Sequence, residues 1–361
     1  MDTITQSLLG AVTAQLGFRQ RLGPGATWVA AGAALVPDLD VFAGPVLRAA
    51  GFEAGGLGHW VVHRGLSHSL LMVPVFALPI AALWWWVRRR KSRTRPRASA
   101  PAPFWLLYAG VFVAILSHPL LDWCTSYGTQ LLAPLSRARL AADCVPIVDV
   151  IYTPLLVLTL LGCLVVRKMK RLNGPRASLA VGWIGFGLSV AYLAGGWVLH
   201  ERAVEVARGL AKGETVVQAD AYPALGSIFL WRTVVETESG WQVARVRPLA
   251  AEAARTARVN SVREDAGPWV ERARALPEVR TFAWFAMRRV RAAYRKEGGE
   301  HVVELHDMRY GLRPESTESL WPLRVRFSDA GEVLEVKRLS SRQRMDPWRA
   351  VAEAWGDLWA P

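Results

Sequence analysis

The sequence predicts a membrane α-helical bundle, with four long spans and a short N-terminal helical hairpin, followed by a C-terminal extracytoplasmic α+β domain. Apolar residues make up 52% of the 361 residues, yet the formal net charge is +14. This combination is typical of membrane proteins with basic loops. The composition changes after His200, so we expect a transmembrane domain over residues 1–200 and a soluble domain over residues 201–361. Because the basic charge is concentrated in two loops between apolar runs, we expect no nucleic-acid partner.

The N-terminal hairpin is predicted from two apolar segments, Thr3–Phe18 and Pro24–Val36, that are too short to cross a bilayer upright. At about 1.5 Å per residue they reach roughly 20–24 Å, less than the hydrocarbon core of about 30 Å. Met1–Phe18 does not fit a signal peptide, because Asp2 stands where a basic start is expected and no small-residue cleavage site follows.

Four later apolar runs have the roughly 17–25 residues that a spanning helix needs. They are Leu70–Val87, Phe104–Trp123, Ile147–Val166 and Leu179–Leu199. Between them lie the loops Arg88–Arg97, with seven basic residues, and Arg167–Arg176, with five, and neither contains an acid. The positive-inside rule places both loops in the cytoplasm. The opposite helix ends, and everything after His200, are then on the outer face.

Polar clusters stand at these outer helix ends. Asp38 and Asp40, in the turn Pro37-Asp38-Leu39-Asp40, can both point toward one cation, although a surface turn capped by Asp gives the same pattern. In the stretch HRGLSHSLL, His63 and His68 are about 140° apart on an ideal helix, so they converge only if the helix breaks. We expect Gly65 to provide that break and Ser67 to cap the span that follows. Snorkelling residues at a membrane interface are the alternative.

A third cluster, SHPLLDWCTSYGT, places His118 and Asp122 four residues apart on one helix face. There they can share a metal ion or form a structural His–Asp pair. Ionisable residues inside a membrane helix are costly unless they pair or bind something, so a functional site is favoured. Thr125 and Thr129 continue the same stripe. Asp149 is a further acid near an outer helix start. It fits a ligand, a partner of a histidine behind the ligands or a charge at the helix dipole, and we expect it behind the ligands.

Together these clusters bring three histidines and four carboxylates to one side of the membrane. That is the ligand mix of a zinc, manganese or iron centre with one or two ions. We expect a divalent transition metal, zinc or manganese first. We also expect the metal ligands to meet in one pocket that Gln6, Arg64, Thr125 and Thr129 line as non-ligands.

The segments MDTITQSLLGA, PDLD, HRGLSHSLL, SHPLLDWCTSYGTQLLAP and PIVDVIYTP, in this order, resemble the YdjM/YbcI family of bacterial inner-membrane proteins. Members are classed as membrane-bound metal-dependent hydrolases, and the resemblance covers about residues 1–200. It implies metal-site roles for Asp38, Asp40, His63, His68, His118 and Asp122, and marks Asp149 as a further characteristic acid. Many relatives carry His where this chain has Gln6, so we expect the N-terminal helix to line the site without binding metal.

The C-terminal part reads as three β-hairpins with helical patches between them. The expected turns are at Glu238-Ser239-Gly240, Gly298-Gly299 and Ala330-Gly331, and helices are expected near Glu201–Ala211 and Pro268–Leu276. His200, His301 and His306 have no ligand spacing. This domain is expected to cover the site or to hold an envelope protein partner.

The sequence therefore predicts a membrane-bound metal-dependent hydrolase that acts on a lipid-linked ester or phosphoester at the outer face of the inner membrane. In this interpretation membrane lipids surround the bundle, Arg64 holds a phosphate, and Asp149 or another non-ligating carboxylate is the base. The alternative is a non-catalytic membrane scaffold or sensor with a structural metal site. A transporter is disfavoured, because no pair of matched broken helices is visible in two halves of the chain.

Overall fold

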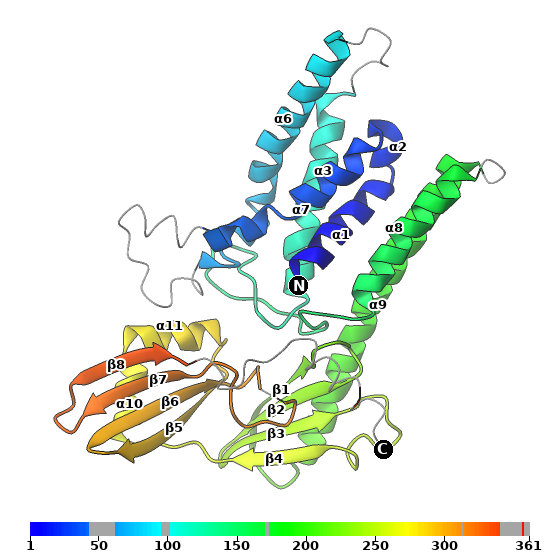
Figure 1. Ribbon diagram of the computed structural model, residues 1–361. Helices are drawn as coiled ribbons and strands as arrows, with labels where there is room; N and C mark the ends of the chain where they lie inside the picture. The colour runs from blue at the N-terminus through cyan, green and yellow to red at the C-terminus, as the bar shows by residue number, and fades with distance from the viewer. Residues whose placement is uncertain (43–61, 95–101, 170–172, 312, 340–355, 357–361) are drawn as a thin grey trace. The chain divides into compact units, whose positions relative to one another are not determined.

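The computed structural model describes residues 1–42, 62–94, 102–169, 173–311, 313–339 and 356 (Figure 1). The described residues form two units, a helical unit within the first 194 positions and a second unit made chiefly of residues from Gly195 onward. Helix α9, Gly174–Leu210, begins in the first unit and ends in the second.

The helical unit opens with three short helices that form the predicted N-terminal hairpin. They are α1 (Thr3–Gln15), α2 (Phe18–Leu22) and α3 (Gly25–Ala33). The sequence did not predict α2, which the prediction treated as the connection. Helices α1 and α3 approach so closely that a Cβ at Gly10 would lie 2.5 Å from the Cβ of Ala34. Helix α1 is capped at its start by Asp2, whose carboxylate accepts a hydrogen bond from the backbone N–H of Thr5.

Two 3-10 turns follow, η1 (Pro37–Phe42) and η2 (Leu66–His68), and then the long helices. These are α6 (Val73–Thr94), α7 (Phe104–Trp123), α8 (Tyr152–Lys168) and α9. The buried centre of the unit consists mainly of alanine, with two valines and one isoleucine, from α1, α3, α6 and α7. Small side chains let the helices approach closely, as is usual in membrane bundles.

Among the described residues, two of the four predicted spans, α7 and α9, are long and apolar enough to cross a membrane. Helix α8 has 17 residues, about 25 Å, which is short of the hydrocarbon core. Helix α6 has 22 residues, but its last two turns carry the basic run Arg88–Lys91. Helix α9 continues to Leu210, so the helix expected separately near Glu201–Ala211 is its last part.

The second unit contains two four-stranded antiparallel sheets, each with its strands in sequence order. The first sheet consists of β1 (Val216–Pro223), β2 (Trp231–Thr237), β3 (Gly240–Val246) and β4 (Arg258–Val262). The second consists of β5 (Val290–Glu297), β6 (Glu300–Asp307), β7 (Leu323–Ser328) and β8 (Val333–Arg338). Helices α10 (Pro268–Ala275) and α11 (Pro277–Phe285) connect the two sheets in sequence.

All three predicted hairpins form, as β2–β3, β5–β6 and β7–β8. At the β5–β6 turn Gly298 and Gly299 have φ of 54° and 87°, which glycine adopts without strain. The predicted helix near Pro268–Leu276 is α10. Strands β1 and β4 and helix α11 were missed, because β1 lacks a tight turn to β2 and four of the five residues of β4 are exposed, without alternating burial.

Candidate metal centre

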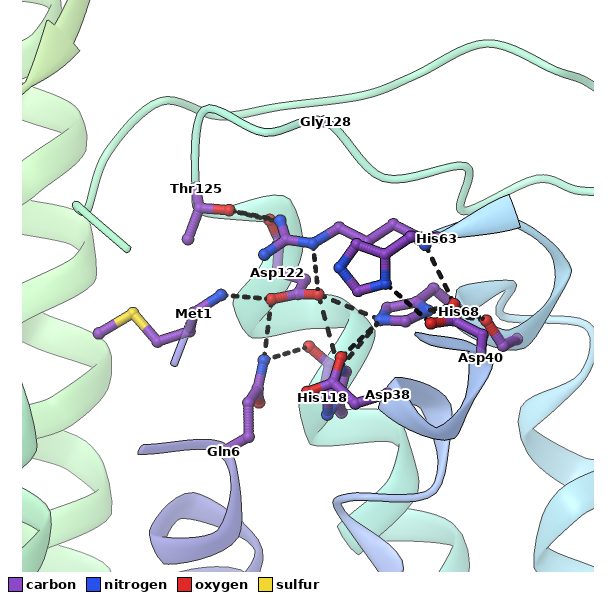
Figure 2. Close-up of polar contacts among 12 residues, drawn as sticks. Met1, Gln6, Asp38, Asp40, His63, His68, His118, Asp122, Thr125 and Gly128 are labelled. Carbon is purple, nitrogen blue, oxygen red and sulfur yellow. Dashed lines mark hydrogen bonds and ion pairs between the residues drawn. The ribbon is translucent and has the colours of Figure 1, made fainter. Parts of the chain in front are cut away.

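Three chain segments deliver the candidate ligands to one place in the helical unit: η1 after α3, the turn before α6, and the last turns of α7 (Figure 2). The helix break predicted between His63 and His68 is present. Gly65 is non-helical as expected, with φ −90° and ψ −128°, and Arg64 before it has a positive φ of 58°. A positive φ is strained for arginine, and such strain is concentrated at functional sites.

Ser67 does not cap the following span as predicted. Helix α6 begins only at Val73, where Pro74 provides the fixed φ that suits a first turn. The hydroxyl of Ser67 donates to Oδ2 of Asp40 at 2.5 Å instead. Ser67 therefore belongs to the polar cluster and does not cap the start of α6.

Four side chains form the inner group: Asp38, His68, His118 and Asp122. One ligand atom from each lies within 4.8 Å of every other. Nε2 of His68 is 3.1 Å from Nε2 of His118, 3.2 Å from Oδ2 of Asp122 and 3.5 Å from Oδ1 of Asp38. Nε2 of His118 is 3.3 Å from the same Asp38 oxygen and 3.5 Å from the same Asp122 oxygen. Ligand atoms at about 2.0–2.1 Å from a tetrahedral metal are about 3.3–3.4 Å apart, so these spacings fit one ion.

The hydrogen bonds of the two rings fix which nitrogen faces the centre. Nδ1 of His118 lies 2.6 Å from the carbonyl oxygen of Ala34, which can only accept, so Nδ1 carries the proton. Nδ1 of His68 lies 3.3 Å from Oδ2 of Asp40. In the neutral rings both Nε2 atoms then present lone pairs to the two carboxylate oxygens. Four electron-rich atoms around one point need a cation between them.

The burial of these side chains strengthens the need for a cation. The side chains of His68 and His118 are fully buried, that of Asp122 is 1% exposed, and only that of Asp38 reaches solvent, at 20%. Oδ2 of Asp122, which points into the group, has no hydrogen bond of acceptable geometry. A buried carboxylate oxygen without a hydrogen-bond donor is costly, and a bound metal ion would supply the missing partner.

The pKa values of Asp38 and His68 also indicate a place that favours positive charge. Burial disfavours the ionised form of Asp38, but hydrogen bonds from His118 and His68 outweigh it and hold its pKa well below the usual range. Burial disfavours the charged form of His68, but its contacts with Asp122, Asp38 and Asp40 raise its pKa to about 10. The carboxylates around His68 thus favour a positive charge at this ring, and a metal ion bound there would compete with its proton.

Asp40 and His63 were predicted as ligands but form a second layer. Oδ1 of Asp40 contacts Nδ1 of His63 at 2.8 Å, while its Oδ2 contacts Ser67, Nδ1 of His68 and the backbone N–H of Arg64. The ring of His63 packs edge-on against the rings of His68 and Tyr127. Asp40 is thus placed to orient His68 from behind, as carboxylates do in histidine metal sites.

Three further groups surround Asp122. Nε of Arg64 lies 3.0 Å from Oδ2, the amino group of Met1 lies 2.5 Å from Oδ1, and Nε2 of Gln6 donates to Oδ1 at 2.9 Å. Arg64 also donates to Oγ1 of Thr125 at 2.7 Å. The prediction that Gln6, Arg64 and Thr125 lie beside the ligands therefore agrees with their contacts. Thr129 is also buried, and its backbone pairs with Leu140.

Asp149 is placed apart from these contacts. Its Oδ1 accepts from the backbone N–H groups of Ile151 and Tyr152 at the start of α8, and its Oδ2 accepts from the hydroxyl of Tyr192 at 2.9 Å. These partners match the helix-start role that the sequence left open for this acid. Sequence reasoning missed Tyr127, whose ring centroid is 4.7 Å from the guanidinium group of Arg64 and 5.3 Å from that of Arg139. Its place in SHPLLDWCTSYGT was the available signal.

The helical unit therefore has the features of an integral membrane protein with a buried two-histidine, two-aspartate group that could hold a metal ion. The comparison with known families agrees with this class. The chain belongs to the YdjM inner membrane protein family, whose model matches residues 1–203. No curated protein sequence and no solved structure matches the chain at a significant level.

Proposed function

We propose that this protein is a metal-dependent hydrolase of the inner membrane that acts on a lipid-linked ester or phosphoester at the outer membrane face. The observation that carries the proposal is the inner group of four ligand atoms, spaced 3.1–3.5 Å apart in the five distances given above. The membrane setting follows from the family and from the apolar helices α7 and α9.

Asp38, His68, His118 and Asp122 would hold one zinc or manganese ion. Such an ion lowers the pKa of a bound water to near neutrality and polarises an ester or phosphoester oxygen. Asp38 is the ligand that fits an exchangeable position, because it lies on a short 3-10 turn and its side chain is 20% exposed. The other three ligands are held by buried contacts.

The second layer would supply proton transfer and charge. Asp40 and His63 form a hydrogen-bonded pair beside the ligands, and this pair suits the base better than Asp149, whose oxygens face α8 and Tyr192. Arg64 balances the charge of Asp122 and stacks on Tyr127. It would stabilise a phosphate oxygen only at the edge of the group, because its guanidinium already contacts Asp122 and Thr125.

One observation favours the non-catalytic alternative. Four protein ligands, three of them with almost no exposure, are typical of structural metal sites, whereas catalytic sites usually keep a position for water. A membrane scaffold or sensor would use the ion to fasten η1 and the turn before α6 to α7. The two functions differ in what the metal does once it is bound.

The deciding experiment combines metal content with hydrolysis. We expect the detergent-purified full chain to bind about one transition metal ion, and His118→Ala to lose it, while His200→Ala, outside the group, keeps it. We also expect metal-dependent hydrolysis of model esters or phosphodiesters that His118→Ala abolishes. Stoichiometric metal without any such hydrolysis would overturn the enzyme and leave the structural site. The absence of bound metal in the wild-type protein would overturn both.

A further inference from the structure

The acidic residues of the helical unit gather at one of its two ends. No Asp or Glu occurs in residues 3–37, 64–121 or 150–200 of the sequence. The described acids of this unit stand at the start of α1, in η1, at the end of α7 and before α8, which is the end that carries the metal centre. The opposite end has basic residues and no acid in the sequence around them.

We call six residues at that opposite end the basic collar: Arg19, Arg21, Arg88, Arg89, Arg90 and Lys91. The first two lie on α2, and the others lie in the last turns of α6. Nη1 of Arg88 donates to the carbonyl oxygen of Leu22 at 2.7 Å, so the two helices are tied together there. Figure 1 shows α2 and the C-terminal half of α6 at the same end of the helical unit.

The collar is interleaved with tryptophan. Each arginine of α6 lies over the tryptophan four residues before it, with guanidinium-to-ring distances of 5.9 Å for Arg88 and Trp84, 4.2 Å for Arg89 and Trp85, and 3.9 Å for Arg90 and Trp86. Such cation–π pairs hold the guanidinium groups at the level of the rings. Tryptophan rings prefer the headgroup level of a bilayer, so the arginines are held at the depth of lipid phosphates.

Exposed rings from neighbouring helices extend the same layer. Trp28, in the first turn of α3, is 80% exposed, and Trp105, in the first turn of α7, is 70% exposed. Phe104, next to Trp105, packs edge-on against Trp85, which joins the start of α7 to the end of α6. These exposed rings around a basic end mark a membrane–water boundary at that end.

We propose that the basic collar is a binding site for the headgroups of anionic phospholipids. Arg89 and Arg90 are its principal contacts, because both are exposed and held on tryptophan. The partner is inferred from charge complementarity: the collar has no acid near it in sequence, and juxtamembrane basic residues are attracted to an anionic leaflet. Guanidinium groups also bind phosphate oxygens in pairs. The inference is independent of the metal centre and of hydrolysis.

The test measures lipids that stay bound to the full chain in mixed micelles with equal amounts of phosphatidylglycerol and phosphatidylcholine. Native mass spectrometry should show phosphatidylglycerol enriched on the wild-type protein. The double variant Arg89→Gln/Arg90→Gln should lower that enrichment at least fivefold, and Arg89→Lys/Arg90→Lys should keep most of it. The charge-matched control is Arg255→Gln/Arg280→Gln, at exposed positions of the second unit, and it should change nothing.

Three outcomes would overturn the proposal. They are equal binding of the two lipids by the wild-type protein, enrichment that survives Arg89→Gln/Arg90→Gln, and an equal loss in the control variant. Inorganic phosphate at matched ionic strength should not displace the bound lipid. Full displacement would assign the collar to small anions and not to a lipid headgroup. Circular dichroism of each variant checks that the helices are intact.

Discussion

At the scale of single residues, Asp38 and Asp40 show how two similar side chains come to differ. They are two positions apart on the same 3-10 turn, yet Asp38 faces Nε2 of His68 and Asp40 faces Nδ1 of the same ring. One carboxylate is therefore in the inner group, and the other contacts His68 from the opposite side of its ring. This division of roles depends on which side of the imidazole each oxygen reaches.

We expect Asp40→Asn to weaken metal binding by about 10- to 100-fold without abolishing it, because an amide orients His68 less firmly than a carboxylate. Asp122→Asn should reduce binding far more, since it removes a ligand charge. Competition with a zinc chelator measures both affinities on the purified protein. Equal losses in the two variants would show that Asp40 binds a metal directly.

Removing the guanidinium group of Arg64 tests whether its positive charge competes with a metal ion for Asp122. With Arg64→Met, the Asp122 carboxylate keeps the Met1 and Gln6 contacts but loses its side-chain cation. We expect metal to bind at least as tightly, because one competing positive charge is removed, while hydrolysis of a phosphodiester falls. The measurements are chelator competition and the rate of hydrolysis. Weaker metal binding in Arg64→Met would show that the residue is needed to build the site.

At the scale of elements, α8 and α9 pack through glycine. A Cβ at Gly185 of α9 would lie 2.1 Å from Oγ1 of Thr159 on α8, whereas a Cβ at Gly187 would meet nothing within 4 Å. Thr159 is buried, and its hydroxyl donates to the carbonyl oxygen of Leu155, so it cannot move away freely. Gly185 therefore allows α9 to pack closely against the 17-residue helix α8 at Thr159.

Gly185→Val should therefore destabilise the helical unit by about 1–3 kcal/mol, the usual cost of overpacking. Gly187→Val makes the same chemical change on the same helix and should leave the stability nearly unchanged. The melting temperature of the purified protein in detergent compares the two. Equal melting temperatures would mean that α8 and α9 are not packed at Gly185.

At the scale of the whole molecule, the basic residues should decide how the chain lies in the membrane. By the positive-inside rule, we propose that the basic collar and the loop at Arg167–Arg176 lie on the cytoplasmic side. The outward direction of α9 would then put the part after His200 outside. This orientation follows from charge and helix count.

Cysteine labelling tests that orientation. In a variant with Cys124, Cys144 and Cys163 replaced by serine, we expect a membrane-impermeant maleimide to label Glu238→Cys from outside, once the outer membrane is opened. Both Glu238 and Arg21 are exposed. Arg21→Cys should react only after the inner membrane is permeabilised. Labelling of the two positions from the same side would contradict the proposed topology.

The sequence alone determined the elements of this protein that follow local rules. Apolar runs and basic loops indicated the helices, paired glycines indicated the β5–β6 turn, and the His and Asp spacing at His118 and Asp122 indicated one helix face. These features depend on residues close together in the chain, for which periodicity and turn chemistry are sufficient. The same rules placed a boundary at His200, where the composition becomes polar, although no Gly or Pro interrupts α9 between Gly196 and Gly209.

The tertiary structure decided which of the predicted ligands meet. Asp38, His68, His118 and Asp122 come from three segments, and their convergence depends on the turn at Arg64 and on the packing of α3 against α7 through Ala34 and His118. Asp40 and His63 lie outside the inner group because of the direction of the imidazole rings, and three hydrogen bonds hold Asp149 apart from it, at the start of α8 and Tyr192. Long-range contacts of this kind have no local signature, because side-chain direction is set only when the segments pack.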